Sequence, residues 1–432
     1  MKKGLKIVFI LCLVLGLACT GLALYAGTHE ERVSLIRENQ AAIAKQEAAA
    51  QAAALLGREI EVDGAVEPME ITPGDQLVLN IYASYSLLLV AGIDLLIVGL
   101  AGLAGGAMKA RRRSGGKSRV NPAGGILGIL MALIVLCLDL ALASEAFLRA
   151  DNLLNVLQQI SINFVIAIGM TFVIISGGID LSVGSNIALS GLLMAIMMKT
   201  YNVNVGLTVA LCILFSGLIG LVNGVMVAYL DLPPFIATLG MMSIARGAAY
   251  TVTGGQPVYT MPASFVAVSG RVAGIPLYAI LIMAGVFFLG WYALRYTRVG
   301  RYTYAIGGNE NCAKLSGINL GRTKCLVYTI SGLCCGVAAL LLTSRLDSAV
   351  PTNADGQEMD AIAAVVIGGT SMKGGEGSMI GTLIGIMIIG VISNGLNLLG
   401  VAQGPQRMVK GLIIVVAVII DVVRRKAAEA AK

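Results

Sequence analysis

A single carboxylate, Asp180, stands in the stretch SGGIDLSVGS, which separates two long apolar runs. In a membrane, such an acid can carry a proton, pair with a cation or bond a polar ligand. Gly177 and Gly178 permit backbone conformations that other residues avoid, so they predict a helix break. Ser182 and Ser185 are candidate caps of the next helix, and Asp180 would complement its dipole. Two interpretations stay open, in which the polar cluster either holds the break together or contacts a substrate.

Further amides lie in or beside apolar runs, where they suit hydroxyl-rich, uncharged ligands because each donates and accepts. They also commonly join helices to one another. The stretch VVIGGTSMKGGEGS (365–378) echoes VIISGGIDLSVGS (173–185), and broken helices at corresponding places indicate a transport pathway. We therefore predict helix breaks at Gly177, Gly178, Gly368 and Gly369. The predicted path residues are Asn163, Asp180, Ser182, Asn186, Asn223 and Asn394.

Catalytic and metal chemistry find little support in this sequence. His29 is the only histidine, which removes a histidine-based triad, an HExxH zinc site and a histidine proton relay. The eight cysteines show no metal-ligand spacing, and seven of them lie in apolar runs. We expect no catalytic residue and no metal site. The GxxxxGK[ST] motif is also missing from the sequence, so any ATP hydrolysis must be supplied by a partner.

The elements that position these residues are membrane helices. Only 13% of the 432 residues are charged and 57% are hydrophobic, whereas soluble domains carry about a quarter charged residues. Many apolar runs reach about 18 residues, the length of a bilayer-spanning helix. The runs are continuous rather than alternating, which argues against a transmembrane β-barrel. We predict an all-α, polytopic transmembrane helical bundle, whose net charge of +7 reflects basic cytoplasmic loops and not nucleic-acid binding.

The chain divides into five predicted parts. Residues 1–27 form an N-terminal transmembrane anchor or uncleaved signal, with a signal peptide cleaved near Ala26 as the alternative. The other parts are an acidic extracytoplasmic segment (28–76) that begins with a polar helix, a second transmembrane span (77–108), a basic cytoplasmic linker (109–122) and the main domain (123–425). The role of the acidic segment is open between contact with a partner and stabilisation.

The main domain holds about ten predicted segments, of which the eighth is too short to cross a bilayer alone. They cover residues 124–143, 153–175, 183–199, 205–229, 235–253, 276–294, 324–343, 361–371, 378–400 and 407–423. Starting from the basic linker inside, ten segments return the C-terminus to the cytoplasm. The loop 295–323 also falls inside, and its excess of basic residues agrees with this topology.

A short helical patch, NENCAKLSGI (309–318), lies within that loop and is typical of an element that docks in a partner's groove. Asn309 is a candidate N-cap and Gly317 a candidate C-terminal stop. The alternative is a merely solvated loop. Arg246 lies within the segment 235–253, where we expect its long side chain to reach toward the membrane surface.

Five ordered motifs carry a family resemblance: SGGIDLSVGS, LPPFIATLGMMSIARG, GRYTYAIGGNENCAKLSGIN, MDAIAAVVIGGTSMKGGEGSMIGTLIG and ISNGLNLLGV. Together they closely resemble the inner-membrane permease subunits of bacterial ABC importers for ribose and related monosaccharides. The resemblance covers about residues 120–425. The two N-terminal spans and the acidic segment 28–76 depart from the family's pattern and are unexplained by it.

The resemblance implies a non-catalytic, multi-pass permease subunit in the bacterial cytoplasmic membrane. It implies a second permease copy, as a homodimer, ATP-binding subunits that hold ATP and Mg, and an extracytoplasmic sugar-binding protein. The coupling helix would comprise Asn309, Glu310, Ala313, Lys314, Leu315, Ser316, Gly317 and Ile318. Ribose is the expected sugar, with other pentoses, hexoses or a polyol open. The alternative function is an ion- or proton-coupled secondary sugar transporter, for which Asp94, Asp139 and Asp180 are the available membrane acids.

Overall fold

The computed structural model describes residues 122–429, parts of 32–43, and residues 69 and 72. The predicted spans 1–27 and 77–108 and all but the last residue of the linker 109–122 lie outside the described residues. The chain forms two compact units. The first comprises residues 1–118 with 395–406, and the second comprises residues 119–394 with 407–432.

The described residues of 32–43 are helical, as predicted for the start of the acidic segment. Ile36 of this helix is buried, at 1% exposure. The backbone N–H of Met69 donates to Asn39 Oδ1 at 3.1 Å, so the polar helix is held to a later part of the same segment.

The second unit is a helical bundle, and each of the ten predicted main-domain segments contains a helix. In chain order these are α5 (Pro122–Ala143), α6 (Ala150–Ile175), α7 (Val183–Lys199), α8 (Val205–Ala228), α9 (Pro234–Thr253), α11 (Leu277–Tyr296), α14 (Leu320–Leu346), α15 (Gln357–Ile367), α16 (Met379–Leu398) and α17 (Gln403–Glu429). Sequence patterns did not predict α10 (Ala263–Val266), a separate α12 (Arg298–Gly308) or the two strands. The docking patch is α13 (Glu310–Leu315).

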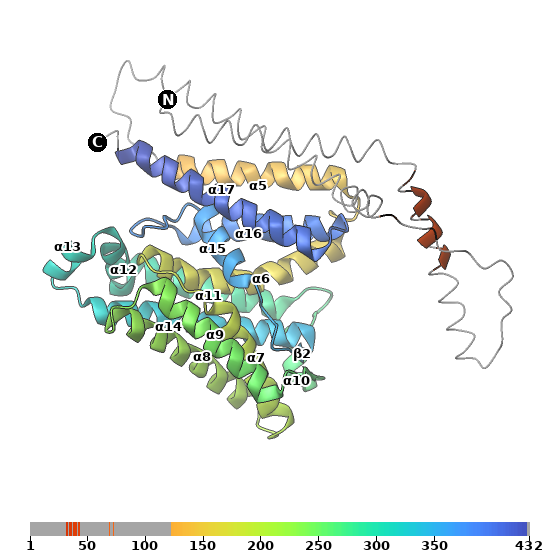
Figure 1. The fold of residues 1–432 in the computed structure, drawn as a ribbon, viewed down its shortest axis with the longest axis horizontal. Helices are drawn as coiled ribbons and strands as arrows, with labels where there is room; N and C mark the ends of the chain where they lie inside the picture. The colour runs from red at the N-terminus through yellow and green to blue at the C-terminus, as the bar shows by residue number, and fades with distance from the viewer. Residues whose placement is uncertain are drawn as a thin grey trace, which may run out of the picture. The chain divides into compact units, whose positions relative to one another are not determined.

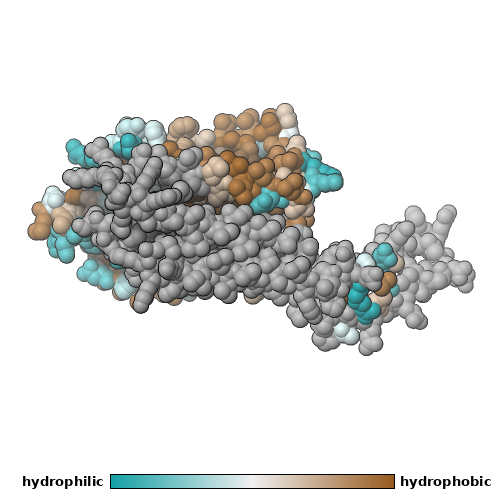
Figure 2. All heavy atoms as spheres, turned by 90° about the horizontal axis from the view of Figure 1, so that it is seen from above, coloured by the Kyte–Doolittle hydropathy of each residue, from teal (hydrophilic) through white to brown (hydrophobic). Residues whose placement is uncertain are grey.

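Six of the described helices, α6, α8, α9, α11, α14 and α16, are long and apolar enough to cross a membrane. At 27 residues, α14 is about 40 Å long, more than the hydrocarbon thickness of a bilayer. The eighth helix, α15, has only 11 residues and is too short to cross alone, as predicted. Figure 2 shows a broad hydrophobic area on the part of the main body that is not drawn in grey, with hydrophilic residues to either side of it. The fold is therefore an all-α polytopic membrane bundle.

Close helix contacts at the centre depend on small residues. The most apolar 18-residue window of α6 is 94% buried, and α6 packs against α14, α11 and α15. Helix α14 also packs closely on α8. A Cβ added to Gly220 of α8 would lie 2.2 Å from the Tyr328 carbonyl oxygen of α14, and one added to Gly332 would lie 2.4 Å from the Ser216 carbonyl oxygen. These glycines let the two backbones meet, as in other membrane bundles.

The two ends of the second unit differ in structure (Figure 1). At one end, β1 (Val258–Tyr259) pairs antiparallel with β2 (Ser348–Ala349) beside α10, and we call this the sheet end. At the other end lie α12 and α13, and we call this the α13 end. Helix α14 runs from the α13 end to the sheet end.

Candidate functional site

Asp180 is the centre of a buried polar cluster after α6. Its Oδ1 accepts hydrogen bonds from the Ser182 backbone N–H at 3.0 Å and from Ser182 Oγ at 2.6 Å. Its Oδ2 accepts from Ser331 Oγ of α14 at 3.0 Å. Asn223 of α8 donates to Ser182 Oγ at 2.8 Å. The cluster thus joins the helix break to two neighbouring helices, and its bonds are those of a structural acid.

Neither serine caps α7 in the way the sequence suggested. Ser182 is the N-cap residue, but its side chain makes no capping bond, because its hydroxyl donates to Asp180 instead. Ser185 is 1% exposed, and its Oγ has no hydrogen-bond partner in the described part of the chain. Asp180 supplies the turn that precedes the helix by accepting from the backbone two residues on.

The other predicted path residues fall into separate places. Asn186 of α7 donates to the Ser216 carbonyl oxygen at 3.1 Å and accepts from Ser216 Oγ at 2.9 Å, so it joins α7 to α8. Asn394 forms a reciprocal amide pair with Asn152, near the opposite end of α6 from Asp180. Asn163 is buried on α6. The structure therefore brings Asp180, Ser182 and Asn223 together, and leaves Asn394 apart from them.

The two predicted helix breaks have the same hydrogen-bond pattern. After α6, the N–H groups of residues 176, 177 and 178 donate to the carbonyls of 172, 174 and 173. After α15, those of residues 368, 369 and 370 donate to 364, 366 and 365, which is the same pattern displaced by 192 residues. Gly177 has φ +84° and Gly369 has φ +89°, the left-handed region that glycine occupies freely. The sequence echo is thus a repeated helix-ending motif.

The breaks touch each other and α12. The Gly375 N–H donates to the Ile175 carbonyl oxygen at 2.9 Å, which joins the loop after α15 to the end of α6. Tyr304 of α12 donates its hydroxyl to the Gly377 carbonyl oxygen at 2.9 Å. Burial raises the pKa of Tyr304, with Arg295 opposing the shift, so the hydroxyl keeps its proton at neutral pH. Tyr304 therefore bonds α12 to the loop after α15, and that loop is bonded in turn to the end of α6.

Replacing Gly307 of α12 by valine is expected to disturb this junction. A Cβ at Gly307 would lie 1.8 Å from the Ile175 carbonyl oxygen, a backbone atom that cannot move aside alone. We expect a destabilisation of about 1–3 kcal/mol, as for other overpacked sites, seen as a lower thermal midpoint in detergent. The matched control is Gly308→Val, because a Cβ there meets no atom within 4 Å. Equal thermal midpoints for the two variants would contradict the close packing of α12 against the end of α6.

The predicted docking residues 309–318 form an exposed corner at the α13 end. Asn309 accepts from the Cys312 N–H at 2.9 Å and so caps α13, as predicted. Gly317, at φ +80°, ends the helix, as predicted. Lys324 pairs with Glu310 at 2.6 Å and ties α13 to α14. Leu315 is 89% exposed, which leaves a large apolar side chain without cover in this chain.

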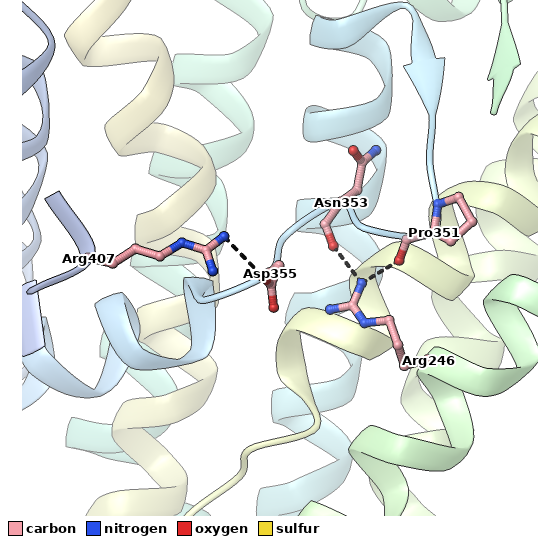
Figure 3. Close-up of polar contacts among 5 residues, drawn as sticks. All are labelled: Arg246, Pro351, Asn353, Asp355 and Arg407. Atoms are coloured by element: carbon pink, nitrogen blue, oxygen red, sulfur yellow. Dashed lines mark hydrogen bonds and ion pairs between the residues drawn. The ribbon is translucent and has the colours of Figure 1, made fainter. Parts of the chain in front are cut away.

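Arg246, whose side chain the sequence predicted to reach toward the membrane surface, is hydrogen-bonded within the protein. Its Nη1 donates to the Pro351 carbonyl oxygen, and to that of Asn353 at 3.0 Å (Figure 3). On the same segment, Asp355 pairs with Arg407 of α17 at 3.2 Å. The segment 350–356 is thus bound from two helices, α9 and α17, between the sheet and the start of α15.

Next to this segment, α7, α9 and the start of α15 line an open pocket of about 380 Å³. Its polar lining residues are Ser185, Ser243, Arg246, Tyr250, Asp355 and Glu358. A Cβ added to Gly184 would lie 2.4 Å from Glu358 Oε2, so this carboxylate rests against the first turn of α7. Within the described residues, no group of three or more histidine, cysteine, aspartate or glutamate side chains is placed to hold a metal.

Sequence reasoning missed most of this pocket. Arg246 was noticed, but Ser243, Tyr250, Asp355 and Glu358 were not considered. A usable signal was present, because Ser243, Arg246 and Tyr250 follow the i, i+3, i+7 spacing of one helix face. A second signal for the pocket was the pair of acids, Asp355 and Glu358, around the start of α15.

Comparisons with known proteins agree with this architecture. A family described as "Branched-chain amino acid transport system / permease component" matches residues 152–418. Ribose import permease protein RbsC of Escherichia coli K12 is 46% identical over 297 residues, which cover 68% of this chain and 92% of the relative. RbsC of Bacillus subtilis 168 is 44% identical over 305 residues, 70% and 94% of the two chains. Fructose import permease protein FrcC of Rhizobium meliloti is 36% identical over 308 residues, 68% and 86%. No solved structure matches the chain.

The apolar helices, the broken segments and the matching family define a multi-pass membrane transport protein. The chain belongs to this family of permease components, and its relatives are the membrane subunits of sugar importers.

Proposed function

We propose that this chain is the permease subunit of an ATP-binding-cassette importer that carries a monosaccharide, ribose, across the bacterial cytoplasmic membrane. The observation that carries the proposal is 46% identity to a ribose import permease over 92% of that protein's length. A fructose permease is less similar, at 36%. The break motifs and the exposed α13 agree with the same function, whereas nothing in the comparisons favours an ion-coupled transporter.

The α13 end faces the cytoplasm in this proposal, and the C-terminus lies on the same side. Support comes from the basic residues Arg295, Arg298, Arg301, Arg322 and Lys324, which gather in and around the loop that holds α12 and α13. The sheet end then faces the outside, where a sugar-binding protein delivers the substrate. A second copy of the chain completes the path.

The chain itself is non-catalytic in this proposal. ATP and Mg are bound by partner subunits that dock on α13, where Leu315 is the exposed apolar anchor. The residues of the coupling helix are those predicted from the sequence, Asn309 to Ile318. A movement of α13 reaches α12, which adjoins it in the chain, and then the two helix breaks through Tyr304 and Gly307. The contacts provide a continuous route from the ATPase to the membrane helices.

A sugar panel tests the substrate. The chain is reconstituted in liposomes with its partner ATPase and binding protein, and uptake of radiolabelled ribose, fructose, galactose and xylose is measured with ATP present. We expect ribose to be taken up fastest. Faster uptake of another sugar in the panel would overturn the assignment of ribose as the substrate. Uptake of none of them would overturn sugar import.

A further inference from the structure

The pocket between α7, α9 and the start of α15 has the chemistry of a carbohydrate site. Arg246 carries only donors, Glu358 only acceptors, and the hydroxyls of Ser243 and Tyr250 serve as both. Sugar hydroxyls also donate and accept, so a mixed set matches them better than a set of one kind. The volume of about 380 Å³ falls in the range of small-molecule sites.

Its position argues against a lipid-facing surface. Arg246 lies inside α9, a helix long and apolar enough to span the membrane. Ser243, Gly247 and Tyr250 share its face of the helix. Charged side chains are costly in hydrocarbon and face protein or water instead. The pocket therefore opens to an aqueous path or to a second subunit, and not to lipid.

One of the hydroxyls that line the pocket is buried. Ser185 is 1% exposed, and its Oγ lacks a hydrogen-bond partner within the described residues. It lies in the first turn of α7, whose N–H groups have no partner within the helix. An unsatisfied buried hydroxyl is costly, so its presence needs an explanation, and a bound water or ligand is one. A sugar oxygen in the pocket would supply the missing partner.

We propose that this pocket holds the monosaccharide during its passage, with Glu358 and Ser185 bonding its hydroxyls and the ring of Tyr250 covering one face. This inference rests on the proposed function and assigns a substrate site to it. Asp355 and Arg246 are already bonded to Arg407 and to the segment 350–356, so they shape the pocket. The Glu358 carboxylate accepts from the backbone N–H of Gly356, but a carboxylate accepts several hydrogen bonds, so it can also bond a sugar hydroxyl.

Thiol protection tests contact with the sugar. Ser243→Cys and Thr251→Cys are prepared in the assembled importer, because Thr251 is exposed on the same helix but does not line the pocket. Modification by a hydrophilic maleimide is followed with the binding protein present, with ribose or with sucrose. We expect ribose, and not sucrose, to slow modification of Ser243→Cys about tenfold and to leave Thr251→Cys unchanged, as for a site largely occupied by ligand. Equal rates with both sugars, or equal protection at both positions, would overturn the site.

A second measurement separates binding from a purely structural role. Glu358→Gln keeps the size of the side chain, and Glu145→Gln is the matched control on an exposed loop. We expect Glu358→Gln to lower ATP-driven ribose uptake about tenfold, the loss of one hydrogen bond to a charged group, while binding-protein-stimulated ATPase activity stays at the parent level. Unchanged uptake, or an equal fall in ATPase activity, would contradict the proposal. ATP-driven uptake by the parent protein in the same vesicles tests the proposed function separately.

Discussion

The Asp180→Ala variant is expected to lose most of its folded protein in the membrane. Removal of the Asp180 carboxylate leaves the Ser182 N–H and the Ser331 hydroxyl buried without their acceptor. Each such group costs about 1–3 kcal/mol, so we expect the free energy of unfolding to fall by about 2–6 kcal/mol. The upper value is a large part of the stability of a typical domain. The measurement is the yield of monodisperse protein and its thermal midpoint in detergent.

Asp180→Asn is the informative companion. Its side-chain oxygen still accepts from the Ser182 N–H, and the Ser331 hydroxyl can rotate to accept from the new amide. We expect this variant to fold and to transport sugar at close to the parent rate. A loss of folded protein as large as that of Asp180→Ala would show that the charge itself is needed. Parent-like folding of Asp180→Ala would contradict a structural role for Asp180.

The Leu315→Asp variant is expected to fold normally and to lose its ATPase subunit. Leu315 is 89% exposed at the corner of α13, so the substitution removes no packing within this chain. An apolar anchor of this kind commonly contributes at least about 2 kcal/mol to an interface, or roughly thirtyfold in affinity. Co-purification of the ATPase with the permease from solubilised membranes measures this loss of affinity. We expect the ATPase to be absent from the purified variant or strongly reduced.

The matched control is Leu346→Asp, an exposed leucine at the opposite end of α14. The same change of charge and size there should leave ATPase binding intact. Normal co-purification with Leu315→Asp would exclude α13 as the docking element. Loss with both variants would indicate a general effect of the added charge.

The helices could be predicted from the sequence because membrane spans are long apolar runs, and the bilayer sets their length. The breaks after α6 and α15 could also be predicted, because a glycine pair followed by polar residues ends a helix for local reasons. For the same reason, Asn309 and Gly317 marked the two ends of α13.

The pocket could not be predicted in this way, because it forms from residues that are distant in the chain. Ser185, Arg246 and Glu358 come from three helices, and only tertiary packing brings them together. The predicted path residues were chosen as polar groups in apolar runs, which selects hydrogen bonds between helices as readily as ligand contacts. Asn186 and Asn223 are bonded in that way, to neighbouring helices. Polar type alone therefore does not separate the two roles.

The energy source of transport tests the central claim most directly. Vesicles that contain the chain, its ATPase and its binding protein are given labelled ribose, first with ATP and an ionophore that collapses ion gradients, then with an imposed proton or sodium gradient and no ATP. We predict uptake in the first condition, with loss of uptake when either partner is omitted, and none in the second. Uptake by the chain alone, driven by an ion gradient without ATP, would contradict its role as the permease of an ATP-driven importer.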